Sequence, residues 1–141
     1  MSTWAAVGTW LSHLRLMLPK AAAYYEEMTR RERVVYIVDD DGGLVAVCTF
    51  FLLEREADAD RYHARSMWST PDDAEDGIWC YVDKLWCRDR SWGKDLCLSL
   101  EFAIRYRYPQ IRWAVWYRPT KDIDRRYTRR VKEGFDALVS G

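Results

Sequence analysis

The sequence is poor in the residues that usually build metal sites, and it carries no net charge. It has only two histidines, and its four cysteines are widely spaced, with none in a Cys-x-x-Cys arrangement. Because structural zinc sites usually need ligands about two to four residues apart, we expect no metal site. The 22 basic and 22 acidic residues cancel. This balance argues against a protein that coats nucleic acid, since phosphate binding needs an excess of positive charge.

Long apolar runs are also missing. The longest runs from Leu44 to Leu53 and includes Thr49, whereas a helix that crosses a bilayer needs roughly 20 apolar residues. The first residues show no basic segment followed by an apolar stretch, as an export signal would. We therefore expect a cytoplasmic protein without a membrane partner and with reduced thiols. No histidine pairs in sequence with a cysteine, so we expect no cysteine nucleophile among Cys48, Cys80, Cys87 and Cys97.

Apolar and aromatic residues are abundant. Hydrophobic residues make up 49% of the 141 residues and aromatic residues 15%. This composition excludes a disordered chain and is enough to build a hydrophobic core. The length predicts one domain, residues 1–141.

The hydrophobic pattern in the first part of the chain changes from helical to strand-like. Residues 4–18 and 21–31 are predicted to form two helices separated by Pro19. Residues 33–38 and 44–53 are rich in β-branched and aromatic side chains, and an Asp-Gly turn joins them. They are predicted to form a β-hairpin.

The second part of the chain is predicted to continue with a strand, a helix, another strand and a last helix. We expect these elements at residues 78–87, 95–106, 111–117 and 122–132, with Asp122 as a cap of the last helix. A strand–helix–strand unit implies a parallel pair of strands. Mid-strand, Asp83 would lie on one face and Lys84 on the other. Such charges are unusual in a buried strand and suggest a cleft.

Two segments carry opposite charge. Residues 54–76 hold eight acidic and three basic residues, and we interpret them as a long loop with a short strand near residues 62–68. Residues 118–133 hold seven basic and three acidic residues. This asymmetry could serve phosphate binding or the self-association of opposite patches.

The residues after the strand at 78–87 carry a resemblance to a known family. They read Arg90-Ser91-Trp92-Gly93-Lys94-Asp95 and open the next helix, where free backbone N–H groups favour anions. The segment resembles the acyl-CoA loop of the GNAT acetyltransferase superfamily, Arg/Gln-x-x-Gly-x-Gly/Ala, with Asp95 in place of the last small residue.

Within that superfamily, residues 78–135 resemble the acetyltransferase domain of N-acetylglutamate synthases. The similar segments are Tyr81-Val82-Asp83-Lys84-Leu85, Trp116-Tyr117-Arg118-Pro119 and Arg126-Tyr127-Thr128. The resemblance implies that Lys84 and Arg118 bind the acceptor's carboxylate and that Tyr127 protonates the leaving thiolate. It also implies that acetyl-CoA, or another acyl-CoA, binds the backbone of Leu85, Trp86 and Cys87 and the loop residues Arg90, Ser91, Trp92, Gly93, Lys94 and Asp95.

The residue types also suggest a proton acceptor for the reaction, and they leave open that the same residues have only a structural role. An attacking amine must lose a proton, and a buried carboxylate such as Asp83 could accept it. Asp83 and Lys84 could equally form an ion pair, and Tyr127 could be a packing residue. We expect Lys84 and Tyr127 to point into one cleft, beyond the carboxyl ends of the two parallel strands.

The resulting hypothesis is an α/β protein of the GNAT type. Its central mixed sheet would splay near Trp86, with helices on both faces and with short or missing C-terminal strands. Its function would be to move an acetyl group from acetyl-CoA to a small amine or amino acid. The alternatives are a non-catalytic GNAT-like module that binds a protein partner or a second copy of itself, and a nucleic-acid binder that uses the basic C-terminal segment.

Overall fold

The computed structural model describes residues 3–119, 121, 123–135 and 138. The chain begins with two helices, α1 (Thr3–Met17) and α2 (Pro19–Arg30). Pro19 occupies the first turn of α2, where its missing N–H leaves no helical hydrogen bond unmade. These helices, and the hairpin that follows, confirm the prediction from hydrophobic periodicity. None of the described helices is long and apolar enough to cross a membrane.

Five strands form one mixed sheet in the order β1-β2-β3-β4-β5. They are β1 (Val34–Val38), β2 (Leu44–Leu53), β3 (Trp79–Cys87), β4 (Trp113–Pro119) and β5 (Asp124–Arg130). Strands β3 and β4 are parallel and all other neighbours are antiparallel. The parallel pair is connected by a short 3-10 turn (Arg90–Trp92) and the helix α4 (Gly93–Arg107).

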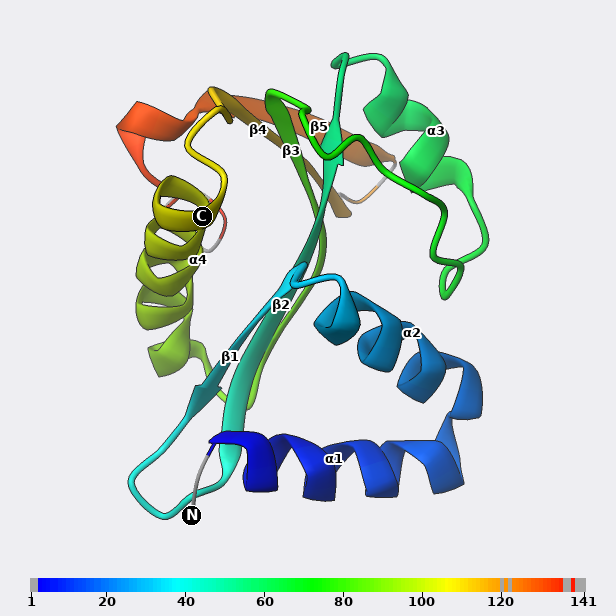
Figure 1. Ribbon diagram of the computed structural model, residues 1–141, viewed down its shortest axis with the longest axis vertical. Helices are drawn as coiled ribbons and strands as arrows, with labels where there is room; N and C mark the ends of the chain where they lie inside the picture. The colour runs from blue at the N-terminus through cyan, green and yellow to red at the C-terminus, as the bar shows by residue number, and fades with distance from the viewer. Residues whose placement is uncertain (1–2, 120, 122, 136–137, 139–141) are drawn as a thin grey trace.

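Helices cover both faces of the sheet (Figure 1). Helix α4 lies on one face, and α1, α2 and α3 (Asp58–Ala64) lie on the other. Successive side chains of β2 point to opposite faces of the sheet and therefore belong to two separate core clusters. Phe50 and Leu52 pack toward α4, whereas Phe51 and Leu53 pack toward α2 and α3. The predicted α/β architecture is confirmed.

The C-terminal segment differs from the prediction. The expected helix at 122–132 is strand β5, which pairs with β4 from Trp113↔Arg130 to Pro119↔Asp124. Strand β5 thus stands where the last helix was expected. After it, the described residues hold a short 3-10 turn (Val131–Glu133) and no further strand. The many basic residues are compatible with a solvated helix, but an edge strand can also carry many charges without burying them. Asp122, the expected cap, lies outside the described residues. The expected short strand near 62–68 is also wrong, because residues 58–64 form α3.

The acidic segment 54–76 is fastened to the rest of the chain by the buried Arg33 and the half-buried Arg31. Arg33 is 2% exposed and contacts the Asp73 and Glu75 carboxylates at 2.8 and 2.7 Å. Arg31 donates to the Thr70 and Pro71 carbonyl oxygens, at 2.8 Å each. The segment is thus a fixed part of the fold, which its polar composition did not indicate.

Candidate functional site at the split between two strands

The parallel strands β3 and β4 pair over only three residues of each. The register runs from Trp79↔Trp113 to Tyr81↔Val115 and then ends. Beyond this point β3 continues beside β2 as far as Cys87, while β4 and β5 turn away (Figure 1). The sheet therefore splits after Tyr81, well before Trp86, where we expected the strands to part.

A β-bulge lies on β3 just past the start of the split. Cys48 pairs with Leu85 and Phe50 with Val82, so Asp83 and Lys84 together oppose Thr49. Two residues opposite one define a bulge and interrupt the alternation of side chains. Both the Asp83 and the Lys84 side chains consequently contact Tyr24 of α2. The expectation that they lie on opposite faces is wrong, because a sequence does not reveal the extra residue in a ladder.

The Asp83 carboxylate is enclosed by donors. Its side chain is 3% exposed and accepts hydrogen bonds from Arg65 Nη2 at 2.7 Å and Nη1 at 3.1 Å. The Tyr24 hydroxyl donates to the same carboxylate and lies 2.6 Å from Thr49 Oγ1. Burial, followed by the Asp83 charge, raises the pKa of Tyr24 well above its usual value. With its oxygens engaged in this way, Asp83 positions its neighbours and is poorly placed to accept a proton from a substrate.

Lys84 is held against aromatic rings beside this carboxylate. Its Nζ lies 5.0 Å from the centre of the Trp68 ring and 5.9 Å from that of Tyr24. Its backbone N–H donates to Thr49 Oγ1 at 3.0 Å. Burial is the main cause that lowers the pKa of Lys84. A partly desolvated cation of this kind suits a ligand carboxylate.

His63 belongs to the same face, and the sequence analysis assigned it no role. Its Nε2 lies 2.9 Å from Asp124 Oδ2 of β5, and its Nδ1 lies 3.4 Å from the Tyr81 hydroxyl. The imidazole stacks on the Tyr117 ring at 3.8 Å and 6°. Burial and a hydrogen bond to Asp60 raise the pKa of Tyr117 to about 12. The only feature of the sequence that could have drawn attention to His63 is that the chain has just two histidines.

Tyr127 and Arg118 lie on the opposite face, toward α4. The Tyr127 ring stacks on Trp116 at 6.0 Å and packs against the same core cluster as Cys87 and Trp92. The Arg118 guanidinium lies 5.8 Å from the Tyr127 ring centre. The prediction that Lys84 and Tyr127 point into one cleft is therefore wrong. It assumed a helix that folds back over the sheet, whereas Tyr127 is on a strand whose side chains alternate.

Trp116 carries a buried donor at the split. It is the first residue of β4 beyond the last β3–β4 pair, and it is 4% exposed. Its indole N–H has no hydrogen-bond partner in the described part of the chain. A buried donor without a partner costs free energy, and such groups are rare in folded proteins. The arrangement is suited to a ligand with an acceptor oxygen on the α4 face.

The loop that opens α4 is only partly suited to an anion. Asp89 accepts hydrogen bonds from the Ser91 N–H, at 3.0 Å, and the Ser91 hydroxyl, and these bonds lower the pKa of Asp89. Arg90 and Lys94 are exposed, and neither forms an ion pair with another described residue. Asp95 lies in the first turn of α4, where a negative charge interacts favourably with the helix dipole.

The remaining predicted cofactor residues differ in exposure. Leu85 and Trp86 are 38% and 41% exposed. Cys87 and Trp92 are half-buried, and Gly93 is buried at the start of α4.

Comparisons with known proteins do not assign the site. No model of a protein family matches the chain, and no curated protein matches it. Among the residues that the structure describes, no three His, Cys, Asp or Glu side chains gather as they would around a metal ion. The geometry at the split is therefore the main indication of function.

Proposed function

We propose that this protein is an N-acyltransferase of the GNAT type, which moves an acetyl group from acetyl-CoA to a small amine or amino acid. The observation that carries the proposal is the split between β3 and β4. Two parallel strands that separate after three pairs leave backbone N–H and C=O groups of β3 without strand partners on that side. An extended ligand with amide groups can pair with such an edge.

The residues around the split fit acetyl-CoA. The Trp116 indole N–H and the free edge of β3 at Leu85 to Cys87 suit the amide and carbonyl groups of the pantetheine arm. Arg90 and Lys94, together with the start of α4, suit the diphosphate. Asp89 opposes this fit in part, because it already accepts the Ser91 N–H. When bound, acetyl-CoA supplies an activated acetyl group as a thioester.

The α2 face would hold the acceptor. Lys84 would bind a carboxylate of an amino-acid acceptor, and its ammonium is positioned by the Trp68 and Tyr24 rings. The Arg65–Asp83 ion pair fixes the bulge that presents Lys84. Arg118, which was expected to share this role, lies on the other face with Tyr127, so the proposal assigns the carboxylate to Lys84 alone.

His63 replaces Asp83 as the proposed proton acceptor. Histidine is the side chain that most often exchanges protons near neutral pH, and Asp124 orients the His63 ring. As the amine nitrogen forms its bond to the acetyl carbon and the carbon–sulfur bond breaks, His63 takes the amine proton. Tyr127, on the α4 face, keeps its proposed role of giving a proton to the leaving sulfur. The proposal requires the acetyl group to be reached from both faces at the split, where β3 and β4 are not paired.

A second candidate is the non-catalytic interaction module, and one observation favours it. Leu98, Phe102 and Tyr106 are 56%, 71% and 79% exposed. They recur every four residues and therefore form an apolar stripe on the outer face of α4. Exposed stripes of this kind often contact another protein.

Isothermal titration with acetyl-CoA separates the two candidates. An acyltransferase should bind with a dissociation constant on the order of micromolar. Arg90→Ala should weaken this binding by about 10- to 100-fold, as the loss of a charged hydrogen bond does. Arg61→Ala is the matched control, because Arg61 is an exposed arginine on α3. Absence of binding at millimolar acetyl-CoA would overturn the proposal and favour the interaction module.

Trp116→Phe tests the proposed contact with the ligand. The substitution removes the indole N–H and keeps an aromatic ring against Tyr127. It should weaken acetyl-CoA binding by roughly tenfold, while Trp113→Phe, at the start of β4 where β3 and β4 are paired, should leave it unchanged. If the two variants bind acetyl-CoA with equal affinity, the Trp116 indole does not contact the ligand.

A further inference from the structure

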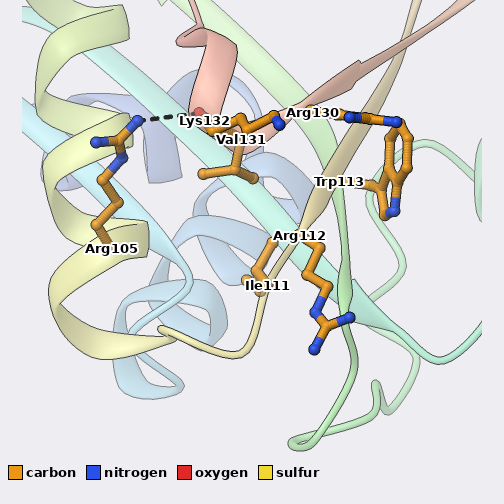
Figure 2. A pocket seen from close by; sticks show the side chains of 7 residues that line it. All are labelled: Arg105, Ile111, Arg112, Trp113, Arg130, Val131 and Lys132. Carbon is orange, nitrogen blue, oxygen red and sulfur yellow. Dashed lines mark hydrogen bonds between the residues drawn. The ribbon is translucent and has the colours of Figure 1, made fainter.

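A cavity lies at the end of the sheet opposite the split. It has a volume of about 550 Å³ and is bounded by the last turns of α4, the start of β4 and the end of β5 (Figure 2). The cavity is lined by Trp113, the first residue of β4, and by the two residues before it. At Trp113, β3 and β4 are still paired. The split begins only after Val115. The two sites are therefore separate.

Positive charge dominates this cavity. Four of the seven residues that line it are basic and none is acidic; the basic residues are Arg105, Arg112, Arg130 and Lys132. Arg105 pairs with Glu101 at 2.9 Å. The other three form no ion pair within the described part of the chain. An uncompensated group of cations around a cavity attracts anions strongly.

Two hydrogen bonds to backbone carbonyl oxygens connect the walls of the cavity. The Val131 N–H donates to the Arg112 carbonyl oxygen at 2.9 Å, which joins the end of β5 to the start of β4. The Arg105 guanidinium donates to the Val131 carbonyl oxygen at 3.2 Å, which joins both strands to α4 (Figure 2). The basic side chains therefore project from a rigid frame, and little order would be lost when a ligand binds.

Trp113 restricts the kind of ligand. Trp79, Trp113 and Arg130 lie side by side on three neighbouring strands. Trp113 stacks with Trp79 at 5.5 Å, and the Arg130 guanidinium lies 5.1 Å from the Trp113 ring centre. Because both neighbours already cover this ring, a nucleobase cannot stack on it. Recognition of a single-stranded nucleic acid usually depends on such stacking.

We propose that this cavity binds the phosphoryl groups of a small phosphorylated molecule. Guanidinium groups recognise phosphate oxygens through paired N–H donors, and an ammonium adds a point charge. The volume of the cavity lies within the usual range of small-molecule sites, about 300–1,000 Å³. The site is independent of the split and of acetyl-CoA.

Titration with inorganic pyrophosphate tests this proposal, with two charge-matched double variants. Arg112→Ser with Lys132→Ser removes two exposed cations at the cavity. Arg90→Ser with Lys94→Ser removes two exposed cations at the loop that opens α4. The first variant should weaken pyrophosphate binding at least tenfold. The second removes the cations proposed above for the diphosphate of acetyl-CoA, and it should weaken pyrophosphate binding less than the first variant does. Circular dichroism spectra of the two variants would be compared with that of the wild type to check that each variant is folded.

Three outcomes would overturn the proposal. The first is absence of pyrophosphate binding at millimolar concentration. The second is a loss of affinity in the Arg90/Lys94 variant that equals or exceeds the loss in the Arg112/Lys132 variant, which would place the anion at the α4 loop. The third is a single-stranded RNA that binds more tightly than pyrophosphate and loses affinity in the Arg112/Lys132 variant, which would make the cavity part of a nucleic-acid surface. Acetyl-CoA binding, measured separately, should be unaffected by the Arg112/Lys132 substitutions.

Discussion

The Arg65 guanidinium donates two hydrogen bonds to the Asp83 carboxylate, at 2.7 and 3.1 Å, and joins the middle of the acidic segment to the bulge on β3. The two side chains are 11% and 3% exposed. Removing one partner of a buried ion pair leaves a desolvated charge without compensation, which costs much more than the loss of a surface pair.

Arg65→Ala should therefore lower the free energy of unfolding by about 3–5 kcal/mol. Urea denaturation measures this change. Arg55→Ala is the matched control, because Arg55 is 77% exposed and pairs with Asp58 on the surface, and its loss should cost less than about 1 kcal/mol. Similar effects of the two substitutions would show that the Arg65–Asp83 pair is not buried as described.

Two glycines should respond in opposite directions to alanine. A Cβ at Gly77 would lie 2.5 Å from the Leu53 carbonyl oxygen, so Gly77→Ala must push the chain away from β2. We expect a loss of about 1–3 kcal/mol of stability. A Cβ at Gly8, within α1, would meet nothing within 4 Å. Gly8→Ala should gain up to about 1 kcal/mol, because alanine favours helices. Thermal unfolding of both variants checks the pair, and stabilisation by Gly77→Ala would contradict the close approach.

The stability of the protein should depend on pH through Lys84. Burial lowers the pKa of Lys84 in the folded chain below the value of about 10.4 that it has when unfolded. Between these two values the unfolded chain binds more protons, so the free energy of unfolding rises with pH. As the pH rises toward about 10.4, the wild type should gain stability relative to Lys84→Met. Urea denaturation across this range measures the difference, with the exposed Lys94→Met as control. A difference that stays flat or reverses would mean that the Lys84 amine is solvated.

His63→Gln should abolish most of the proposed transferase activity. Loss of a general base lowers turnover by roughly 10² to 10⁴-fold, and the pH dependence that the base causes should disappear with it. Thiol release from acetyl-CoA with a panel of amino acids measures turnover. His13→Gln provides the control, because His13 lies on α1. If His63→Gln keeps the turnover and pH profile of the wild type, another group accepts the proton.

Local pattern was enough to predict part of this fold. The helices at the N-terminus, the hairpin and the parallel unit around α4 follow from periodicity, turn residues and the handedness of crossover connections. Each depends on residues that are near one another in sequence. The local pattern also indicates a cleft at Asp83 and Lys84, since two adjacent charges in an apolar strand conflict with burial.

The sequence by itself thus determined the helices α1, α2 and α4, the first strands and the mixed α/β class, and it singled out Asp83 and Lys84 as charges within an apolar strand. Only the tertiary structure decided that the bulge turns both side chains to one face, that Tyr127 lies on the other, and that His63 meets Asp124. It also decided that residues 124–130 form an edge strand and that Arg33 is buried with Asp73. The physical reason is the same in each case. A ladder register, a strand edge and a buried ion pair depend on partners that are distant in the sequence, and no local pattern encodes which partner will be opposite.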